Sequence, residues 1–159
     1  MIFFNPKQFV DSQACLDCKG CCRFKGEKSL WRPKLMKQEA DYISEEIVDE
    51  ESRIKSVISG NQYICTFLDE KTSMCRKYVE RPFECLLYPF VLVQKTGEVM
   101  VAAHLACPFI QEKKDSDAFL KYCQELKDFF VSIEDKTEIK TLAQSYPNVD
   151  QELDILFSI

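Results

Sequence analysis

The sequence lacks the long apolar runs and basic clusters that would associate it with a membrane or with nucleic acid. It contains no apolar stretch of about 20 residues, so we expect no membrane-spanning segment. Its first residues show no basic start, long apolar region or small-residue cleavage site, so we also expect no secretory signal. Lysine and arginine form no basic stripe and the net charge is −5, which argues against nucleic acid as a partner.

Several catalytic signatures are missing as well. No nucleophile motif, phosphate-binding loop or paired-carboxylate pattern is present, and neither is the C-x-x-x-C-x-x-C spacing of radical enzymes that use S-adenosylmethionine. The single histidine, His104, stands three residues before Cys107. Histidine can bind zinc or iron, but we expect His104 to be capped or solvated, because the thiols already supply enough donors. Whether His104 is a ligand stays open at this point.

Cysteine, by contrast, is abundant, with nine in 159 residues. Either disulfides or metal binding could account for so many thiols. Disulfide-rich scaffolds are usually shorter and secreted, whereas we expect this chain in the cytoplasm, where reducing conditions favour metal thiolates. A protein of this length can also bury a core without disulfides. The cysteines therefore predict a soft metal.

The densest group of thiols is the run Cys15-Leu-Asp-Cys18-Lys-Gly-Cys21-Cys22. Two residues between thiolates is the spacing with which a tight turn directs both sulfurs at one metal. Gly20 gives the backbone room to fold around an ion. We therefore expect residues 15–28 to form a metal-binding loop, after an extended or short helical lead-in over residues 1–14.

The other cysteines lie beside turns and prolines. The apolar spacing predicts a helix that Pro33 opens and that runs through residue 58. A strand over residues 62–68, a turn over 69–72 and a return strand over 74–78 should follow. If the loop of this hairpin holds three or five residues, Cys65 and Cys75 stand opposite each other on one face.

The second half mixes helices with one more hairpin. A short helix from Pro82 to Pro89 should carry Cys85, and strands near residues 91–93 and 99–101 should form the hairpin. A helix should begin near Ser116, and Cys123 falls on its apolar stripe, so we assign it to the core. The tail over residues 134–159 should form two short helices interrupted at Pro147.

Several motifs resemble, in order, a known family of small cysteine-cluster proteins, the YkgJ-like group described as zinc- or iron-chelating domains. The C-x-x-C-x-x-C-C motif matches residues 15–22, C-x-F-L matches 65–68 and C-x-x-Y matches 75–78. The R-P-x-x-C-x-x-Y-P-F motif matches residues 81–90, and Cys107 corresponds to a late cysteine of the family. The resemblance covers roughly residues 15–108 and implies metal chelation by these cysteines.

The identity of the metal is left open between an iron–sulfur cluster, zinc, and another soft metal or mixed occupancy. Neighbouring side chains diverge, so Cys21 and Cys22 suit two irons of one cluster, two separate ions, or one ligand and one supporting thiol. Cys15, Cys18 and Cys21 have the C-x-x-C-x-x-C spacing of bacterial ferredoxins, which favours an iron–sulfur cluster such as 4Fe-4S. Eight thiolates could instead form two zinc sites of four cysteines each.

Together these features predict one small α+β domain over residues 1–159, with short β-hairpins and helices packed around a cysteine-ligated metal centre. The cysteine-cluster region should span about residues 15–108, and a helical part about 113–159. The cofactor-binding and metal-ligating residues that we predict are Cys15, Cys18, Cys21, Cys22, Cys65, Cys75, Cys85 and Cys107.

The predicted function is metal binding, as a redox or metal-carrier module that could serve a protein partner. One alternative is a metal-dependent enzyme of methyl or group transfer, because a similar cluster occurs in flagellin lysine N-methylases. The other alternative is a structural zinc module for protein contacts. Whether the chain is an enzyme is therefore left open.

The Cys15–Cys22 run generates the first testable prediction. Replacing Cys18 by Ser should lower the metal-to-protein ratio and the melting temperature together, because a structural metal contributes on the order of 10 kcal/mol to folding. Cys123→Ala is the matched control: it should cost about 1–2 kcal/mol and keep the metal. An unchanged metal content in Cys18→Ser would contradict the prediction.

Overall fold

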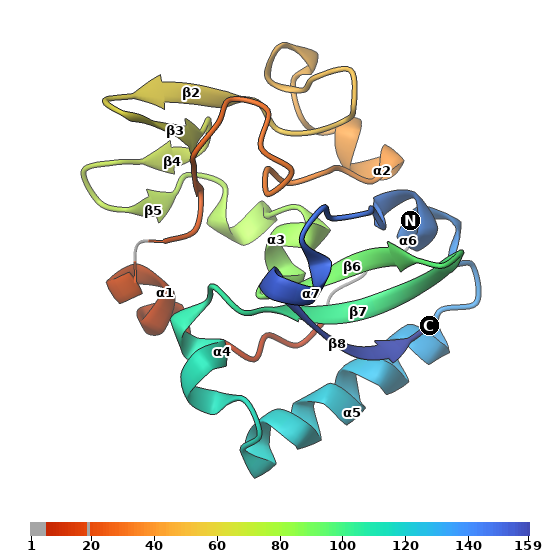
Figure 1. Cartoon of the computed structure of the whole chain (residues 1–159). Helices are drawn as coiled ribbons and strands as arrows, with labels where there is room; N and C mark the ends of the chain where they lie inside the picture. Colours follow the sequence, from red (N-terminus) through yellow and green to blue (C-terminus); the bar gives the residue numbers. More distant parts are fainter. Residues whose placement is uncertain (1–5, 19) are drawn as a thin grey trace. The chain divides into compact units, whose positions relative to one another are not determined.

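The computed structural model describes residues 6–18 and 20–159, and the chain forms two compact units (Figure 1). One unit, here the cysteine unit, is Ser12–Cys85. The other, here the sheet unit, is Leu86–Ile159 together with the described residues that end at Asp11. Short antiparallel sheets and helices occur in the chain, which confirms the predicted α+β class. None of the helices in the described part of the chain is both long and apolar enough to cross a membrane.

The sheet unit contains one three-stranded antiparallel sheet in the order β6-β7-β8 (Figure 1). Its strands are β6 Phe90–Lys95, β7 Glu98–His104 and β8 Leu153–Ser158. Thr96 and Gly97 have φ values of 51° and 82°, the left-handed conformation of a tight two-residue hairpin turn. The predicted hairpin in this region is therefore confirmed.

The helices of the sheet unit are α4 Pro108–Lys113, α5 Asp117–Ser132, α6 Thr137–Leu142 and α7 Val149–Glu152. Ser116 caps α5 by accepting a hydrogen bond from the amide of Phe119, so the predicted start of this helix is confirmed. The ring of Phe90 on β6 lies 6.0 Å from that of Phe119 and 5.1 Å from that of Tyr122, measured between centroids. These aromatic contacts pack α5 against the start of β6.

Strand β8 was not expected, because the tail was predicted to hold only two helices. Those helices, α6 and α7, are present on either side of Pro147. The segment after α7 instead pairs with β7, for example Leu153 with His104 and Phe157 with Val101. Such pairing joins residues about 50 positions apart, so no local pattern in the tail reveals it.

Cys123 lies beside the buried stripe of α5. The residues of this helix that are buried are Phe119, Tyr122, Leu126 and Phe130, whereas Cys123 is half-buried. Burial raises the pKa of the Cys123 thiol to about 11, and the negative charge of Asp154 adds to the increase. Cys123 therefore contributes less to the core than its position in the sequence pattern predicted.

The cysteine unit is built from short elements. Its strands are β1 Arg23–Phe24, β2 Ser56–Ser59, β3 Gln62–Cys65, β4 Leu68–Asp69 and β5 Met74–Cys75. They form a sheet in the order β1-β3-β2 and a separate β4-β5 hairpin. Its helices are α1 Ser12–Cys18, α2 Lys37–Ala40 and the start of α3 Phe83–Leu87, with 3-10 turns at Glu45–Ile47 and Tyr78–Glu80.

The long helix predicted over residues 33–58 is wrong. Only α2 and the turn at Glu45–Ile47 are helical there, and residues 56–58 belong to β2. The apolar residues that suggested a continuous stripe do not share one face. Leu35 and Ile54 are buried, while Tyr42 and Ile58 are exposed.

Two buried arginines hold the ends of this non-helical segment by hydrogen bonds. Arg53 donates from Nη1 to the carbonyls of Leu30 and Arg32, at 3.1 and 2.8 Å. Arg32 donates from Nη1 to Oδ2 of Asp49 at 2.7 Å. Asp49 Oδ1 in turn accepts the amides of Glu51 and Arg53. The amides of Glu51 and Arg53, which a continuous helix would pair with backbone carbonyls, are thus satisfied by a side chain.

The Asp49 carboxylate generates a pH-dependent prediction. Burial raises its pKa, but the hydrogen bonds from the Arg53 amide and the Arg32 side chain outweigh that effect and hold the pKa below its usual range. A depressed carboxyl pKa contributes stability above the unfolded-state value of about 4, and this contribution is lost as the pH falls through the folded-state value.

Asp49→Asn should therefore lower the free energy of unfolding at pH 7 by about 2–3 kcal/mol, the cost of a hydrogen bond to a charged partner. Denaturant unfolding of both proteins at pH 7 and pH 3 measures the effect. The difference between the two proteins should shrink at pH 3. A constant difference at both pH values would contradict the assignment.

Candidate metal centre

Four cysteines from separated segments of the cysteine unit act on one another electrostatically. Cys22 immediately precedes β1, Cys65 ends β3, Cys75 ends β5, and Cys85 is the third residue of α3. Cys65 is buried in the hydrophobic core of this unit, and Cys22 packs against the same core. We refer to these four residues as the inner thiols.

The pKa values of the inner thiols reflect this proximity. Burial raises the pKa of Cys22 to about 12, and the negative charges of Cys65, Cys21 and Cys75 add to the increase, while Arg23 opposes it. Burial also raises the pKa of Cys85 well above its usual range, with further contributions from Cys22 and Cys65. Cys22 and Cys85 therefore resist ionisation unless a cation compensates their charge.

Backbone amides donate to two of the inner sulfurs. The amide of Lys77 donates to Sγ of Cys75 at 3.4 Å. A hydrogen bond from the amide of Phe67 lowers the pKa of Cys65, although burial outweighs it and leaves that pKa raised. In both cases the donor stands two residues after the cysteine. Such amide-to-sulfur bonds stabilise negative charge on a thiolate.

The expected register of the Cys65 and Cys75 strands is wrong. Cys75 pairs with Leu68 across the β4-β5 hairpin, whereas Cys65 pairs with Ser56 across β2 and β3. The predicted single hairpin is divided, because β3 joins the larger sheet and the chain then turns before β4. The charge of Cys75 nevertheless raises the pKa of Cys65, so the two thiols still interact.

Cys22 has an unusual backbone conformation. Its φ is 65°, in the left-handed region that costs a non-glycine residue roughly 1–2 kcal/mol. Its carbonyl accepts the amide of Cys65 at 2.8 Å. The sequence therefore keeps a cysteine where glycine would be easier to accommodate, which favours a role for the thiol.

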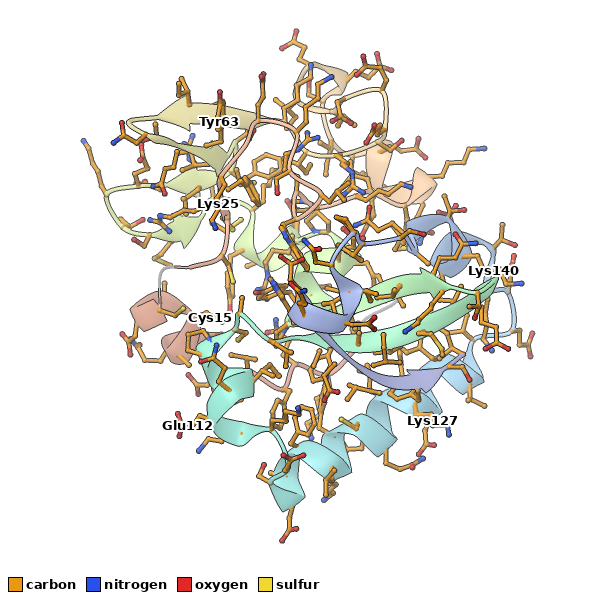
Figure 2. The ribbon with its side chains drawn as sticks, in the orientation of Figure 1. Cys15, Lys25, Tyr63, Glu112, Lys127 and Lys140 are labelled. Atoms are coloured by element: carbon orange, nitrogen blue, oxygen red, sulfur yellow. The ribbon has the colours of Figure 1, made fainter. Side chains whose placement is uncertain are left out.

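The first three cysteines differ from the inner thiols in exposure. Cys15, Cys18 and Cys21 are exposed, and Cys15 is labelled in Figure 2. Cys15 and Cys18 belong to α1, so the prediction of a loop is wrong for these residues. Helical spacing still places residues three apart on one face of a helix. We refer to Cys15, Cys18 and Cys21 as the outer thiols.

Cys107 and His104 belong to the sheet unit. Cys107 is half-buried at the N-cap of α4, and its amide donates to the carbonyl of His104. His104 Nδ1 and the Tyr88 hydroxyl form a hydrogen bond of 3.0 Å, and burial lowers the pKa of His104. The expectation that His104 is capped agrees with this contact.

The donor chemistry of the inner thiols fits zinc or iron, both of which bind cysteine sulfur. Across residues 6–18 and 20–159, however, no three cysteine, histidine or acidic side chains form a ready-made metal-binding group. The inner thiols therefore lie within electrostatic range of one another without being gathered as a coordination shell. The predicted set of eight ligands stays a prediction.

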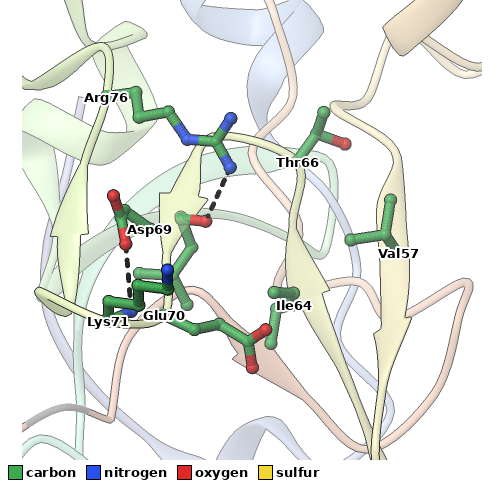
Figure 3. Close-up of a pocket in the computed structure, with 8 residues that line it drawn as sticks. Val57, Ile64, Thr66, Asp69, Glu70, Lys71 and Arg76 are labelled. Carbon is green, nitrogen blue, oxygen red and sulfur yellow. Dashed lines mark hydrogen bonds between the residues drawn. The ribbon is translucent and has the colours of Figure 1, made fainter.

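A pocket of about 400 Å³ opens beside the β4-β5 hairpin, which carries Cys75 (Figure 3). Arg76 reaches into its lining and donates to the carbonyl of Leu68 at 3.2 Å, and the amide of Lys71 donates to Asp69. The charges of Asp69, Glu70, Lys71 and Arg76 balance. The pocket therefore shows no preference for an anionic or a cationic ligand.

Sequence reasoning missed two carboxylates that contact the start of α3. Glu39 accepts the amides of Phe83 and Met36, and Glu84 accepts the amide of Lys34. Burial raises the pKa of Glu84 to about 7, although the Lys34 amide and Arg53 oppose the increase. One signal for this role is present in the sequence: Glu39 stands three residues after Met36, the spacing at which a glutamate accepts the backbone amide of a helix N-cap residue.

The left-handed conformation of Cys22 generates the third prediction. Cys22→Gly should leave the metal-free melting temperature near that of the wild type, because relief of backbone strain offsets the lost side-chain packing. The same change should lower the metal content, because it removes a thiol. Cys123→Ala is the control for thiol removal elsewhere. If Cys22→Gly kept its full metal content, Cys22 would not be a ligand.

Comparison with known proteins places the chain in a family. No curated protein and no solved structure matches it. A family model does match residues 14–124, more than two thirds of the chain, and its description is "CxxCxxCC: Putative zinc- or iron-chelating domain". The match contains all four inner thiols, the outer thiols and Cys107. The chain therefore belongs to the CxxCxxCC family of zinc- or iron-chelating cysteine domains.

Proposed function

We propose that this protein binds zinc or iron through its cysteines, and that the inner thiols Cys22, Cys65, Cys75 and Cys85 hold one centre. The observation that carries the proposal is their mutual electrostatic interaction, since each comes from a different segment of the cysteine unit. Burial raises the pKa values of Cys22, Cys65 and Cys85, so these thiols ionise only when a cation compensates the charge.

A bound cation would make ionisation of these buried thiols favourable. Metal binding converts thiols to thiolates and releases protons, and the attraction between the metal and each sulfur offsets the cost of that ionisation. The amides of Phe67 and Lys77 support the negative charge on Cys65 and Cys75. The hydrophobic residues around Cys65 would keep water from the centre.

We propose an iron–sulfur cluster as the favoured occupant. Eight thiols, the ferredoxin-like spacing of Cys15 to Cys21 and the adjacent pair Cys21-Cys22 support a polynuclear centre. The outer thiols are then the further ligands. Such a cluster would supply one-electron transfer, which suits a redox or carrier module in the cytoplasm, where thiols stay reduced.

A structural zinc module is the second candidate. The cysteine unit contains only two- to four-residue strands and short helices, and small domains with so little regular structure commonly depend on a metal. Four thiolates are also the number that closes a tetrahedral zinc site. In this case the inner thiols would hold zinc and stabilise the fold without chemistry.

Metal analysis after anaerobic purification from iron- and zinc-supplemented cells tests the proposal. We expect a brown protein with broad absorption near roughly 400 nm that dithionite bleaches. Cys85→Ser should reduce the metal content, whereas Cys123→Ala should not. A colourless protein with stoichiometric zinc would favour the structural module. A purified protein with neither metal, which also fails to take up either one, would contradict metal binding itself.

A further inference from the structure

Two glutamates join the start of α3 to the segment around α2. Glu39 lies on α2 and Glu84 is the second residue of α3, immediately before Cys85. Both are half-buried and both belong to the cysteine unit. Neither glutamate is among the predicted metal ligands, so their position near Cys85 needs another explanation.

Each carboxylate accepts one backbone amide from the other segment. Oε1 of Glu39 accepts the amide of Phe83 at 2.6 Å, while its Oε2 accepts the amide of Met36 at 2.9 Å. Oε2 of Glu84 accepts the amide of Lys34 at 2.7 Å. The two segments therefore hold each other by reciprocal hydrogen bonds from backbone amides to glutamate side chains.

These bonds fix where α3 begins. The first amides of a helix have no acceptor within the helix, and Phe83 is the first residue of α3. Its amide is held by Glu39, and its side chain is only 1% exposed. Because Cys85 follows two residues later on the same short helix, the direction of its thiol depends on this start.

The segment that holds α3 is itself rigidly anchored. Arg53 donates hydrogen bonds to the carbonyls of Leu30 and Arg32, which precede Lys34 in the chain. Lys34 and Arg53 also form an isolated antiparallel bridge. The positive charge of Arg53 acts on Glu84. Lys34 and Glu84, the donor and the acceptor of this hydrogen bond, therefore both interact with the buried Arg53, which limits the movement of each.

We propose that Glu39 and Glu84 are positioning residues that orient the Cys85 thiol toward the other inner thiols. The proposal rests on the proposed function, because it takes Cys85 as a metal ligand. Glu84 acts through its hydrogen bond to Lys34, and Glu39 acts through Phe83. Neither carboxylate binds the metal, and both determine how well Cys85 reaches it.

A double-mutant cycle tests whether Glu84 acts through Cys85. The metal-free wild type, Glu84→Ala, Cys85→Ser and the double variant are titrated anaerobically with Co²⁺ against a competing chelator. Cobalt serves as a coloured probe of thiolate sites. Glu84→Ala should weaken Co²⁺ binding by about 10–100-fold, the usual effect of losing a group that orients a ligand. In the Cys85→Ser background the same change should have almost no effect.

Two conservative variants separate positioning from charge. Glu84→Gln should restore near wild-type affinity, because its side-chain carbonyl can still accept the Lys34 amide. Glu39→Gln should weaken binding in part, because one amide oxygen replaces two carboxylate oxygens that accept from Phe83 and Met36. The thiolate-to-cobalt absorption should fall in Glu84→Ala and recover in Glu84→Gln.

Val48→Ala is the matched control for lost stability. It removes a side chain packed against the core of the same unit and leaves the hydrogen bonds of Glu39 and Glu84 in place, so it shows how much Co²⁺ affinity falls through destabilisation alone. Glu84→Ala must exceed that loss. If Glu84→Ala weakened Co²⁺ binding equally in the wild-type and the Cys85→Ser backgrounds, the positioning role would be overturned. An unchanged affinity in Cys85→Ser would instead show that Cys85 is not a ligand, which contradicts the proposed function.

Discussion

The cost of ionising buried thiols is the constraint on which the proposed site in the cysteine unit depends. Cys22, Cys65 and Cys85 all have raised pKa values because they are removed from water and because neighbouring thiols add negative charge. A buried neutral thiol packs like a small apolar side chain, so burial alone does not require a metal. The proposed site draws further support from two features: backbone amides donate to two of the sulfurs, and hydrogen bonds to Glu39 and Glu84 fix the start of α3.

The two units use different means to stabilise their folds. In the sheet unit, α5 packs aromatic and aliphatic side chains against β6, as in any layered domain. In the cysteine unit the hydrophobic core is small, and the buried arginines Arg32 and Arg53 organise the chain between residues 29 and 54. Polar networks of this kind specify one conformation but add little net stability, which leaves room for a metal to contribute.

Local patterns in the sequence predicted the elements that depend on local contacts. Ser116 at the start of α5, the Thr96-Gly97 turn and the short helix that carries Cys85 were all expected from neighbouring residues. Elements that depend on distant partners were not. Leu35 and Ile54 have helical spacing but meet a core built by β1, β3 and β4, and β8 exists only because β7 offers an edge. For the site, the cysteines identified the chemistry, but their division into inner and outer thiols depends on tertiary structure, as does the involvement of Glu39 and Glu84.

The central claim is that the inner thiols hold the metal of this chelating family. X-ray absorption at the metal edge of the anaerobically purified protein tests it most directly, with Cys85→Ser as the comparison. The account predicts a coordination shell dominated by sulfur, at about 2.3 Å for zinc, which loses a sulfur neighbour in Cys85→Ser. A shell of oxygen and nitrogen alone, or a sulfur shell that Cys85→Ser leaves unchanged, would contradict it.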